Sequence, residues 1–69
     1  MTYTQFVLRH RLDRALRMLR DPRCAARRIS DIAYDVGFGD LSYFNRVFRR
    51  RYGVAPSDVR AEARETRSH

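Results

Sequence analysis

Polar side chains that can hydrogen-bond to nucleic-acid bases recur along one predicted helix in the middle of the chain. These side chains follow the spacing i, i+3, i+4 and i+7, and they are Ser42, Asn45, Arg46 and Arg49. This spacing puts them on one helical face. Asn can form two hydrogen bonds with adenine, Arg can form two with guanine, and Ser can bond to either base. A single surface Arg is more often part of a solvated face, so the stripe needs support from the elements that would hold it.

A second face of the same helix is apolar and would anchor it in a core. The spacing i, i+3, i+4 and i+8 is occupied by Phe44, Val47, Phe48 and Tyr52, which is typical of a helix packed on one side. The helix is expected to begin at Asp40, because Asp is a favoured N-cap residue. The two faces together predict a helix that is held by its apolar side and presents its polar side to a ligand.

The segment before this helix has the features of a partner helix and a sharp turn. Ala33 lies four residues before Gly37, so a small residue on the buried face would let a second helix cross closely. Glycine readily adopts the left-handed backbone that often ends a helix. Apolar residues surround the pair, namely Ile29, Ile32, Val36 and Phe38. This combination predicts a helix-turn-helix, a DNA-binding arrangement.

The position of each polar residue along the second helix suggests its role. The first residues of a reading helix normally touch base edges, which makes the base-reading candidates Leu41, Ser42, Asn45 and Arg46. In this set Leu41 would contact a thymine methyl. Later positions suit phosphates better, and the candidates are Tyr43, Arg49, Arg50 and Arg51. A tyrosine such as Tyr43 more commonly lies at the edge of a small core, and that alternative stays open.

The composition favours a polyanionic partner and leaves room for one domain. The chain has 69 residues, 15 basic residues that are all Arg, 8 acidic residues, a net charge of +7 and a pI of about 11.0. Such a balance is typical of nucleic-acid-binding proteins. The charge is uneven, because residues 1–28 hold eight Arg against two Asp, while residues 29–55 hold four against three. Much of the electrostatic attraction is therefore expected from the first helix and the loop after it.

The remaining elements are predicted to be helical, which makes the fold class all-α. A first helix is expected over residues 2–20, opened by a capping box of Thr2 and Gln5 and ended by Pro22. Its apolar stripe is Phe6, Leu12, Ala15, Leu16 and Leu19, widened by Val7, Leu8 and Met18. A last helix is expected from Pro56 to about Arg64. The predicted divisions are a helix at 1–21, a basic loop at 22–28, a helix-turn-helix with a bracing helix at 29–65, and a tail at 66–69.

Other kinds of site receive no support from the sequence. His10 and His69 have no partner at metal-ligand spacing, so we expect no metal and no cofactor. Three aspartates, Asp31, Asp35 and Asp40, are interpreted as helix-start charges and not as catalytic carboxylates. There is no nucleophile–base pair and no phosphate-binding glycine loop, so an enzyme is not expected. A redox role for the single Cys24 is the less favoured alternative to an incidental cysteine. No apolar run approaches the length of a membrane span.

Taken together, these positions resemble one family of bacterial transcription regulators, the AraC/XylS family. The segment from Ile29 to Arg60 is similar to its second helix-turn-helix through Ile32-Ala33, Gly37-Phe38, Asp40, Ser42-Tyr43-Phe44, Arg46, Phe48, Gly53, Pro56 and Arg60. The first helix is similar to the family's linker helix through Phe6, Arg11-Leu12, Ala15 and Leu19. The resemblance implies a homeodomain-like three-helix unit behind a linker helix. It also implies a cytoplasmic, nucleoid-associated protein that binds double-stranded DNA and has RNA polymerase as a further partner.

The resemblance also shows two departures and one missing part. Ala55 replaces the Ser or Thr that usually caps the last helix, and Val59 replaces an aromatic residue. The family's DNA-binding domain has two helix-turn-helix units, and this chain resembles the second half. An alternative function is therefore a truncated fragment that acts as a protein-interaction module or binds DNA without sequence preference. In that case we expect self-association through Val7, Leu8 and Met18 of the linker helix.

Overall fold

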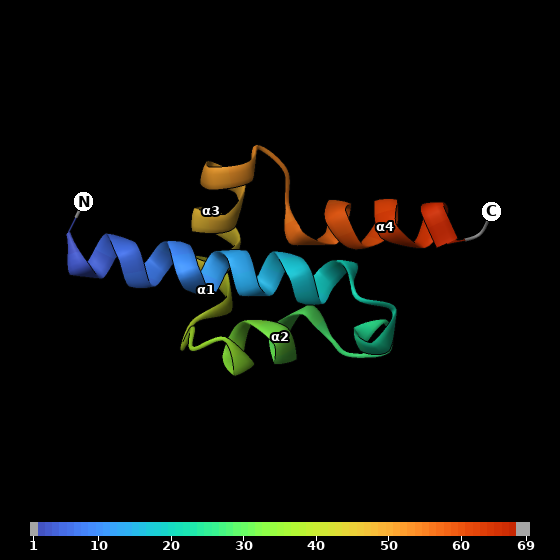
Figure 1. Ribbon diagram of the computed structural model, residues 1–69, viewed down its shortest axis with the longest axis horizontal. Helices are drawn as coiled ribbons and strands as arrows, with labels where there is room; N and C mark the ends of the chain where they lie inside the picture. The colour runs from blue at the N-terminus through green and yellow to red at the C-terminus, as the bar shows by residue number, and fades with distance from the viewer. Residues whose placement is uncertain (1, 68–69) are drawn as a thin grey trace.

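The computed structural model describes residues 2–67, which form four α-helices and one short 3-10 turn without any strand. In chain order these are α1 (Tyr3–Arg20), a 3-10 turn (Pro22–Cys24), α2 (Ile29–Asp35), α3 (Leu41–Tyr52) and α4 (Pro56–Arg67). The predicted all-α class is confirmed. α1 is the longest element, and its N-terminal turns project past α2 and α3 (Figure 1). The described part measures 41 × 21 × 18 Å.

The predicted capping box at the start of α1 is confirmed. The backbone N–H of Gln5 donates to the Thr2 hydroxyl at 3.1 Å, and the Thr2 N–H donates to the Gln5 side-chain oxygen at 3.0 Å. These bonds satisfy two backbone donors that a helix start leaves without intrahelical partners. α1 ends at Arg20, and Asp21 then caps the 3-10 turn by accepting from the Arg23 N–H at 2.9 Å.

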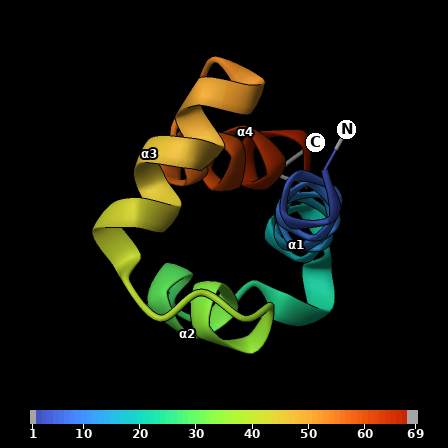
Figure 2. The same cartoon turned by 90° about the vertical axis from the view of Figure 1, so that its left-hand side faces the viewer.

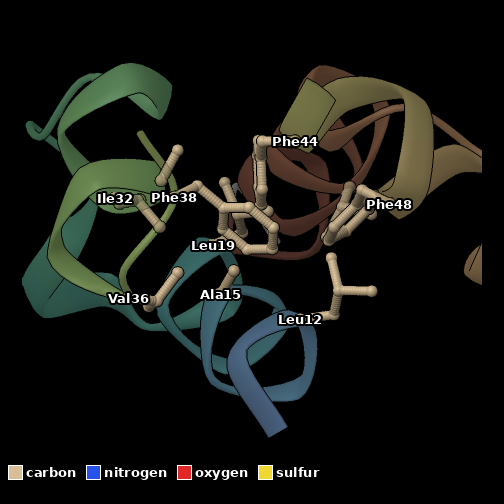
Figure 3. Packing of buried hydrophobic residues seen from close by; sticks show 10 residues of the cluster. Leu12, Ala15, Leu19, Ile32, Val36, Phe38, Phe44 and Phe48 are labelled. Atoms are coloured by element: carbon tan, nitrogen blue, oxygen red, sulfur yellow. The ribbon is translucent and has the colours of Figure 1, made fainter. Parts of the chain in front are cut away.

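A small hydrophobic core lies where the four helices meet. The buried residues of α1, α2 and α3 converge in Figure 3, with α1, α2, α3 and α4 arranged around the centre in the view along α1 (Figure 2). The buried apolar set is Leu12, Ala15, Leu19, Ile32, Ala33, Val36, Phe38, Phe44, Phe48 and Val59. Burying a side chain as large as Phe stabilises the fold by about 1.5–3 kcal/mol. The two phenylalanines of α3 therefore fix that helix to the rest of the domain.

The turn between α2 and α3 has the predicted glycine in a positive-φ conformation. Gly37 has φ +108°, and its N–H donates to the Tyr34 carbonyl at 3.1 Å. The N–H of Phe38 donates to the Ala33 carbonyl at 2.9 Å, so the two bonds form a Schellman-type helix end. Phe38 then turns inward and packs against Phe44, with ring centroids 5.0 Å apart. This turn sets the direction in which α3 leaves α2.

α4 braces the domain through a buried arginine as well as through its apolar face. Arg60 is only 8% exposed. Its Nη1 donates to the Arg27 carbonyl and its Nη2 donates to the Cys24 carbonyl at 3.2 Å. Hydrogen bonds of this kind offset the cost of burying a charged group. Arg60 thereby ties α4 to the loop that connects α1 with α2.

Several expectations about α1 and the loops are wrong in detail. Phe6 was expected in the core stripe but is 59% exposed, because the first turns of α1 extend beyond the other helices. Leu8 and Met18 were expected to widen this stripe, and both are partly buried and pack against the core. The exposed docking face that the alternative function placed on them is therefore wrong for these two residues. The segment 22–28 was expected to be a plain loop, but it begins with the 3-10 turn.

Two further expectations near helix ends are corrected. Asp35 was interpreted as a helix-start charge, but it is the last residue of α2 and forms an ion pair with Arg27. That partner compensates a carboxylate placed at the negative end of the helix. The last helix was expected to end near Arg64 but continues to Arg67. Of the predicted tail, residues 68 and 69 lie outside the described part of the chain.

Candidate nucleic-acid interface

α3 is held with its predicted reading face toward solvent. Its N-cap is Asp40, whose carboxylate accepts from the backbone N–H groups of Ser42 at 2.8 Å and Tyr43 at 3.2 Å. Its C-terminal end is closed by Gly53 in the left-handed conformation, with φ +79°. Phe44 and Phe48 are fully buried beneath it. The ends and the buried face are therefore fixed, which leaves the opposite face available to a ligand.

Most of the predicted DNA-contacting residues lie together on that face. The exposed residues of α3 are Ser42, Tyr43, Asn45, Arg46, Arg49, Arg50 and Arg51. Leu41 differs, because it is partly buried and packs against the core at the start of the helix. The structure thus brings the polar base-reading and phosphate candidates other than Arg51 onto one side of a single helix, with Leu41 at its margin.

Tyr43 has contacts on both sides that limit how it can move. Its ring lies 6.1 Å from that of Phe38 in the turn, and the guanidinium carbon of Arg46 lies 5.6 Å from its centroid. A guanidinium over an aromatic face is favourable by about 0.5–1 kcal/mol at an exposed site. Tyr43 is 40% exposed, so it is both an edge of the core and a support for Arg46.

Arg51 is engaged differently from Arg49 and Arg50. Its Nε donates to Asp13 of α1 at 3.4 Å, and its guanidinium carbon lies 5.3 Å from the ring centroid of Tyr52. The Tyr52 hydroxyl donates to the same Asp13 carboxylate. These contacts connect the end of α3 to the middle of α1. They engage part of the Arg51 guanidinium in contacts within the domain.

The Asp13 cluster shifts the pKa values of its three members, among which the hydrogen bond with Tyr52 raises that of Arg51 above its ordinary value. The hydrogen bond from Tyr52, followed by the charge of Arg51, lowers the pKa of Asp13 below its ordinary value of 3.8. Burial, followed by the hydrogen bond to Asp13, raises the pKa of Tyr52 above its ordinary value of 10.0. At neutral pH the cluster therefore consists of an ionised carboxylate, a neutral tyrosine and a cationic arginine.

The sequence did not single out the residues of α1 that accompany this interface. Asp13 is the one acidic residue within α1, among five arginines of the same helix, and this isolation was a usable signal. Gln5 and Arg9 of α1 also face α3 across a groove of about 890 Å³. Side chains on helices far apart in sequence meet here, and helical periodicity within one segment does not reveal such pairs.

Two other kinds of site find no support in residues 2–67. No group of three or more His, Cys, Asp or Glu side chains in this range is arranged to hold a metal ion. None of the helices in the described range combines the length and apolarity that a membrane span requires.

Comparison with known proteins identifies the family. The Helix-turn-helix domain family matches residues 1–62. The chain belongs to the AraC-type helix-turn-helix family. The AraC-type assignment agrees with the geometry of α2, the Gly37 turn and α3. Members of this family are DNA-binding transcription regulators.

The relatives of this AraC-type domain are bacterial transcription regulators. It is 54% identical over 59 residues to the transcriptional activator RhrA of Rhizobium meliloti, covering 86% of this chain and 18% of that protein. It is 37% identical over 60 residues to the transcriptional activator RhaS of Citrobacter koseri, covering 87% and 20%. It is 37% identical over 59 residues to the transcriptional regulatory protein YesN of Bacillus subtilis, covering 84% and 16%.

The AraC-type chain corresponds to only part of these proteins. It spans between 16% and 20% of the length of the three relatives. No solved structure gives a significant match to it.

Proposed function

We propose that this AraC-type domain binds duplex DNA with sequence preference by inserting α3 into one major groove. The observation that carries the proposal is the exposed polar face of α3, which is rigidly backed by Phe44 and Phe48. An α-helix fits the major groove of B-DNA, where each base pair presents a distinct pattern of donors and acceptors. A helix with fixed ends presents its side chains to that pattern without a large ordering cost.

Within this proposal the residues of α3 divide into two groups. The base-reading group is Leu41, Ser42, Asn45 and Arg46, and the phosphate-binding group is Tyr43, Arg49, Arg50 and Arg51. The exposure of Asn45 and Arg46 supports the first group. Arg51 is expected to contribute less than Arg49 and Arg50, because Asp13 and the Tyr52 ring already engage its guanidinium.

The proposal is tested by selecting bound sequences from randomised duplex DNA at near-physiological salt. Enrichment of a short motif, within one groove width, is the expected result. A matched selection with Asn45→Ala should lose part of that motif, whereas Arg14→Ala, on an exposed part of α1, should keep it. Salt-sensitive binding without any enriched motif would contradict sequence reading by α3 and leave only electrostatic attachment.

Further partners belong to the same proposal. The names of RhrA and RhaS as transcriptional activators support RNA polymerase as a partner of the bound regulator. Self-association through α1 is proposed as well, but through Tyr3 and Phe6, which are 83% and 59% exposed. Both residues belong to the start of α1 (Tyr3–Arg20), and the N-terminal turns of this helix project past α2 and α3 (Figure 1). We assign the domain no catalytic activity and place it in the bacterial cytoplasm on the nucleoid.

A further inference from the structure

A groove between α1 and α3 is lined partly by apolar side chains, which contact with DNA does not require. It has a volume of about 890 Å³, and its lining residues are Gln5, Leu8, Arg9, Leu12, Tyr43, Arg46, Val47, Arg50 and Arg51. The apolar members are Leu8, Leu12 and Val47, and all three contribute to the hydrophobic core or pack against it. Phosphate groups bind arginine and backbone donors and gain nothing from such apolar surface.

The groove is also strongly positive. Four arginines line it, and no acidic residue is among its lining side chains. Asp13 of α1, which does not line the groove, accepts hydrogen bonds from Arg51 and Tyr52. Its negative charge interacts with both Arg51 and Arg9, so Asp13 offsets part of the positive charge of these two residues. The charges of Arg46 and Arg50 favour an anion within the groove.

The geometry of Arg46 fits it for binding such an anion. Its guanidinium stacks on the Tyr43 ring, with the guanidinium carbon 5.6 Å from the ring centroid. Stacking restrains the plane of the guanidinium and leaves its N–H groups at the edge, where they can form paired hydrogen bonds with a carboxylate or phosphate. Arg50 lies one helical turn further along the same side of α3.

We infer that the α1–α3 groove binds a small amphipathic organic anion, whose apolar body lies on Leu8 and Val47 and whose acidic group binds Arg46 and Arg50. Small-molecule sites are typically mostly apolar clefts of about 300–1,000 Å³ with a few placed polar groups, and they often lie between helices. The groove lies between two helices, and its volume falls in this range. A fatty carboxylate and an aryl or alkyl phosphate share the required chemistry.

Such a ligand would compete with DNA. This competition rests on the proposed function, because Arg46 and Arg50 are assigned there to a base and a phosphate. A guanidinium that holds the ligand's acidic group cannot also form its two bonds with guanine. The bound anion also neutralises positive charge beside the reading face, which weakens attraction to phosphates.

The binding test uses octanoate and the 69-residue chain without DNA. Backbone amide NMR shifts should saturate with a dissociation constant of about 1 mM, a weak affinity suited to a ligand of this size, and should map to Leu8, Val47 and Arg46. Neither 1-octanol, which lacks the charge, nor acetate, which lacks the chain, should reproduce them. Shifts that are spread over all arginine-rich surfaces, or that acetate reproduces, would overturn the inference.

Matched variants separate the groove from general electrostatic attraction. Arg46→Gln and Leu8→Gln should each weaken octanoate binding about tenfold, one by removing a charged hydrogen-bond partner and the other by removing apolar contact. Arg14→Gln removes the same charge from an exposed position that does not line the groove and should leave the affinity unchanged. Circular dichroism verifies that Leu8→Gln, which alters a partly buried position, remains folded. Equal losses in Arg46→Gln and Arg14→Gln would overturn the site.

Competition is then measured separately by fluorescence anisotropy with labelled duplex DNA. Octanoate should displace DNA from the wild-type chain, whereas 1-octanol should not. Octanoate binding without displacement would overturn the competition. If the wild-type chain binds octanoate but no DNA, the proposed function fails and the groove assignment stands. If it binds DNA but no octanoate, the groove assignment fails alone.

Discussion

At the residue scale, two arginines of α3 have clearly different proposed roles in DNA binding. Arg46 stacks on Tyr43 near the start of α3, whereas Arg50 is exposed one turn later. Base contacts carry sequence information, and phosphate contacts carry affinity that is nearly independent of sequence. The proposed function therefore gives the two residues separable signatures, although both substitutions remove one positive charge.

Arg46→Ala is expected to cost roughly 1–3 kcal/mol of DNA binding and to relax the preference at one or two base pairs. Arg50→Ala should weaken binding to every sequence alike and reduce the salt slope by about one. Fluorescence anisotropy across a salt series, with an enriched and a scrambled duplex, measures both quantities. Identical behaviour of the two variants would contradict the division between base-reading and phosphate-binding residues.

A second residue-scale prediction concerns Asp13 and Tyr52, which lie 39 positions apart and are joined by a hydrogen bond. The pKa of Asp13 is lowered in the folded protein, so its contribution to stability is present above the ordinary value of 3.8 and is lost as pH falls through the lower folded pKa. Tyr52→Phe removes the main cause of that shift. This substitution should lower the free energy of unfolding by about 1 kcal/mol at pH 7 and by less in strong acid.

Thermal unfolding followed by circular dichroism at pH 7 and at strongly acidic pH measures this difference. Tyr3→Phe is the matched control, because the Tyr3 side chain is 83% exposed, and it should leave both melting temperatures unchanged. An equal loss of stability for Tyr52→Phe at the two pH values would show that the hydrogen bond to ionised Asp13 contributes nothing.

At the scale of elements, the ends of the helices decide how α3 is presented. The turn before it depends on Gly37, whose φ of +108° is rarely adopted by other residues. A Cβ at this position would also approach the Nε of Arg11 to 3.0 Å. Arg11 itself donates to the Gly37 carbonyl at 3.4 Å, so the turn and α1 are held together at the same point.

Gly37→Ala is therefore expected to destabilise the domain by about 1–2 kcal/mol through backbone strain. Gly39→Ala is the matched control, since Gly39 has no positive φ and no heavy atom lies within 4 Å of its added Cβ. Urea unfolding of the two variants makes the comparison. A Gly39→Ala loss as large as that of Gly37→Ala would show that general flexibility of the turn, and not the φ of Gly37, is the requirement.

The start of α4 has only half of a capping box. The Ala55 N–H donates to the Asp58 carboxylate at 3.1 Å, but Ala55 has no hydroxyl to accept a bond in return. Ala55→Ser should stabilise the domain by about 1 kcal/mol and raise the melting temperature. Ala61→Ser, at an exposed position inside the same helix, should give no increase. An unchanged or lower melting temperature for Ala55→Ser would show that residue 55 is not the cap.

At the scale of the whole molecule, the projecting turns of α1 place apolar side chains beyond the reach of the core. Phe6 is 59% exposed, and Tyr3 beside it is 83% exposed. In many proteins, exposed apolar surface of this kind is buried when the protein associates with another chain. The proposed self-association should therefore depend on Phe6 and not on the basic face of α3.

Sedimentation over a wide concentration range should show that the chain associates as its concentration rises, and Phe6→Ser should shift the chain toward monomer without lowering its melting temperature. Arg50→Ala is the control and should associate like the wild type. A wild-type profile that stays monomeric throughout the range would contradict association through α1.

The helices, their caps and the core stripe of α3 follow from the sequence, because each depends on residues within a few positions. The Thr2–Gln5 box, the Asp40 cap and the Gly37 turn are local hydrogen-bonding and backbone requirements, and periodicity alone indicates the buried side of Phe44 and Phe48. The grouping of polar residues on one face of α3 also depends only on helical spacing within that segment.

Only the tertiary structure decided which surfaces remain exposed and which distant side chains meet. Periodicity placed both Phe6 and Leu8 in the apolar stripe of α1, but Phe6 is exposed and Leu8 is partly buried. A residue is buried only where another helix covers it, and α1 is longer than its partners. The Asp13–Tyr52 bond, the Arg60 contacts with the loop and the groove between α1 and α3 join residues more than 30 positions apart. Such meetings depend on how whole helices cross, which no single segment encodes.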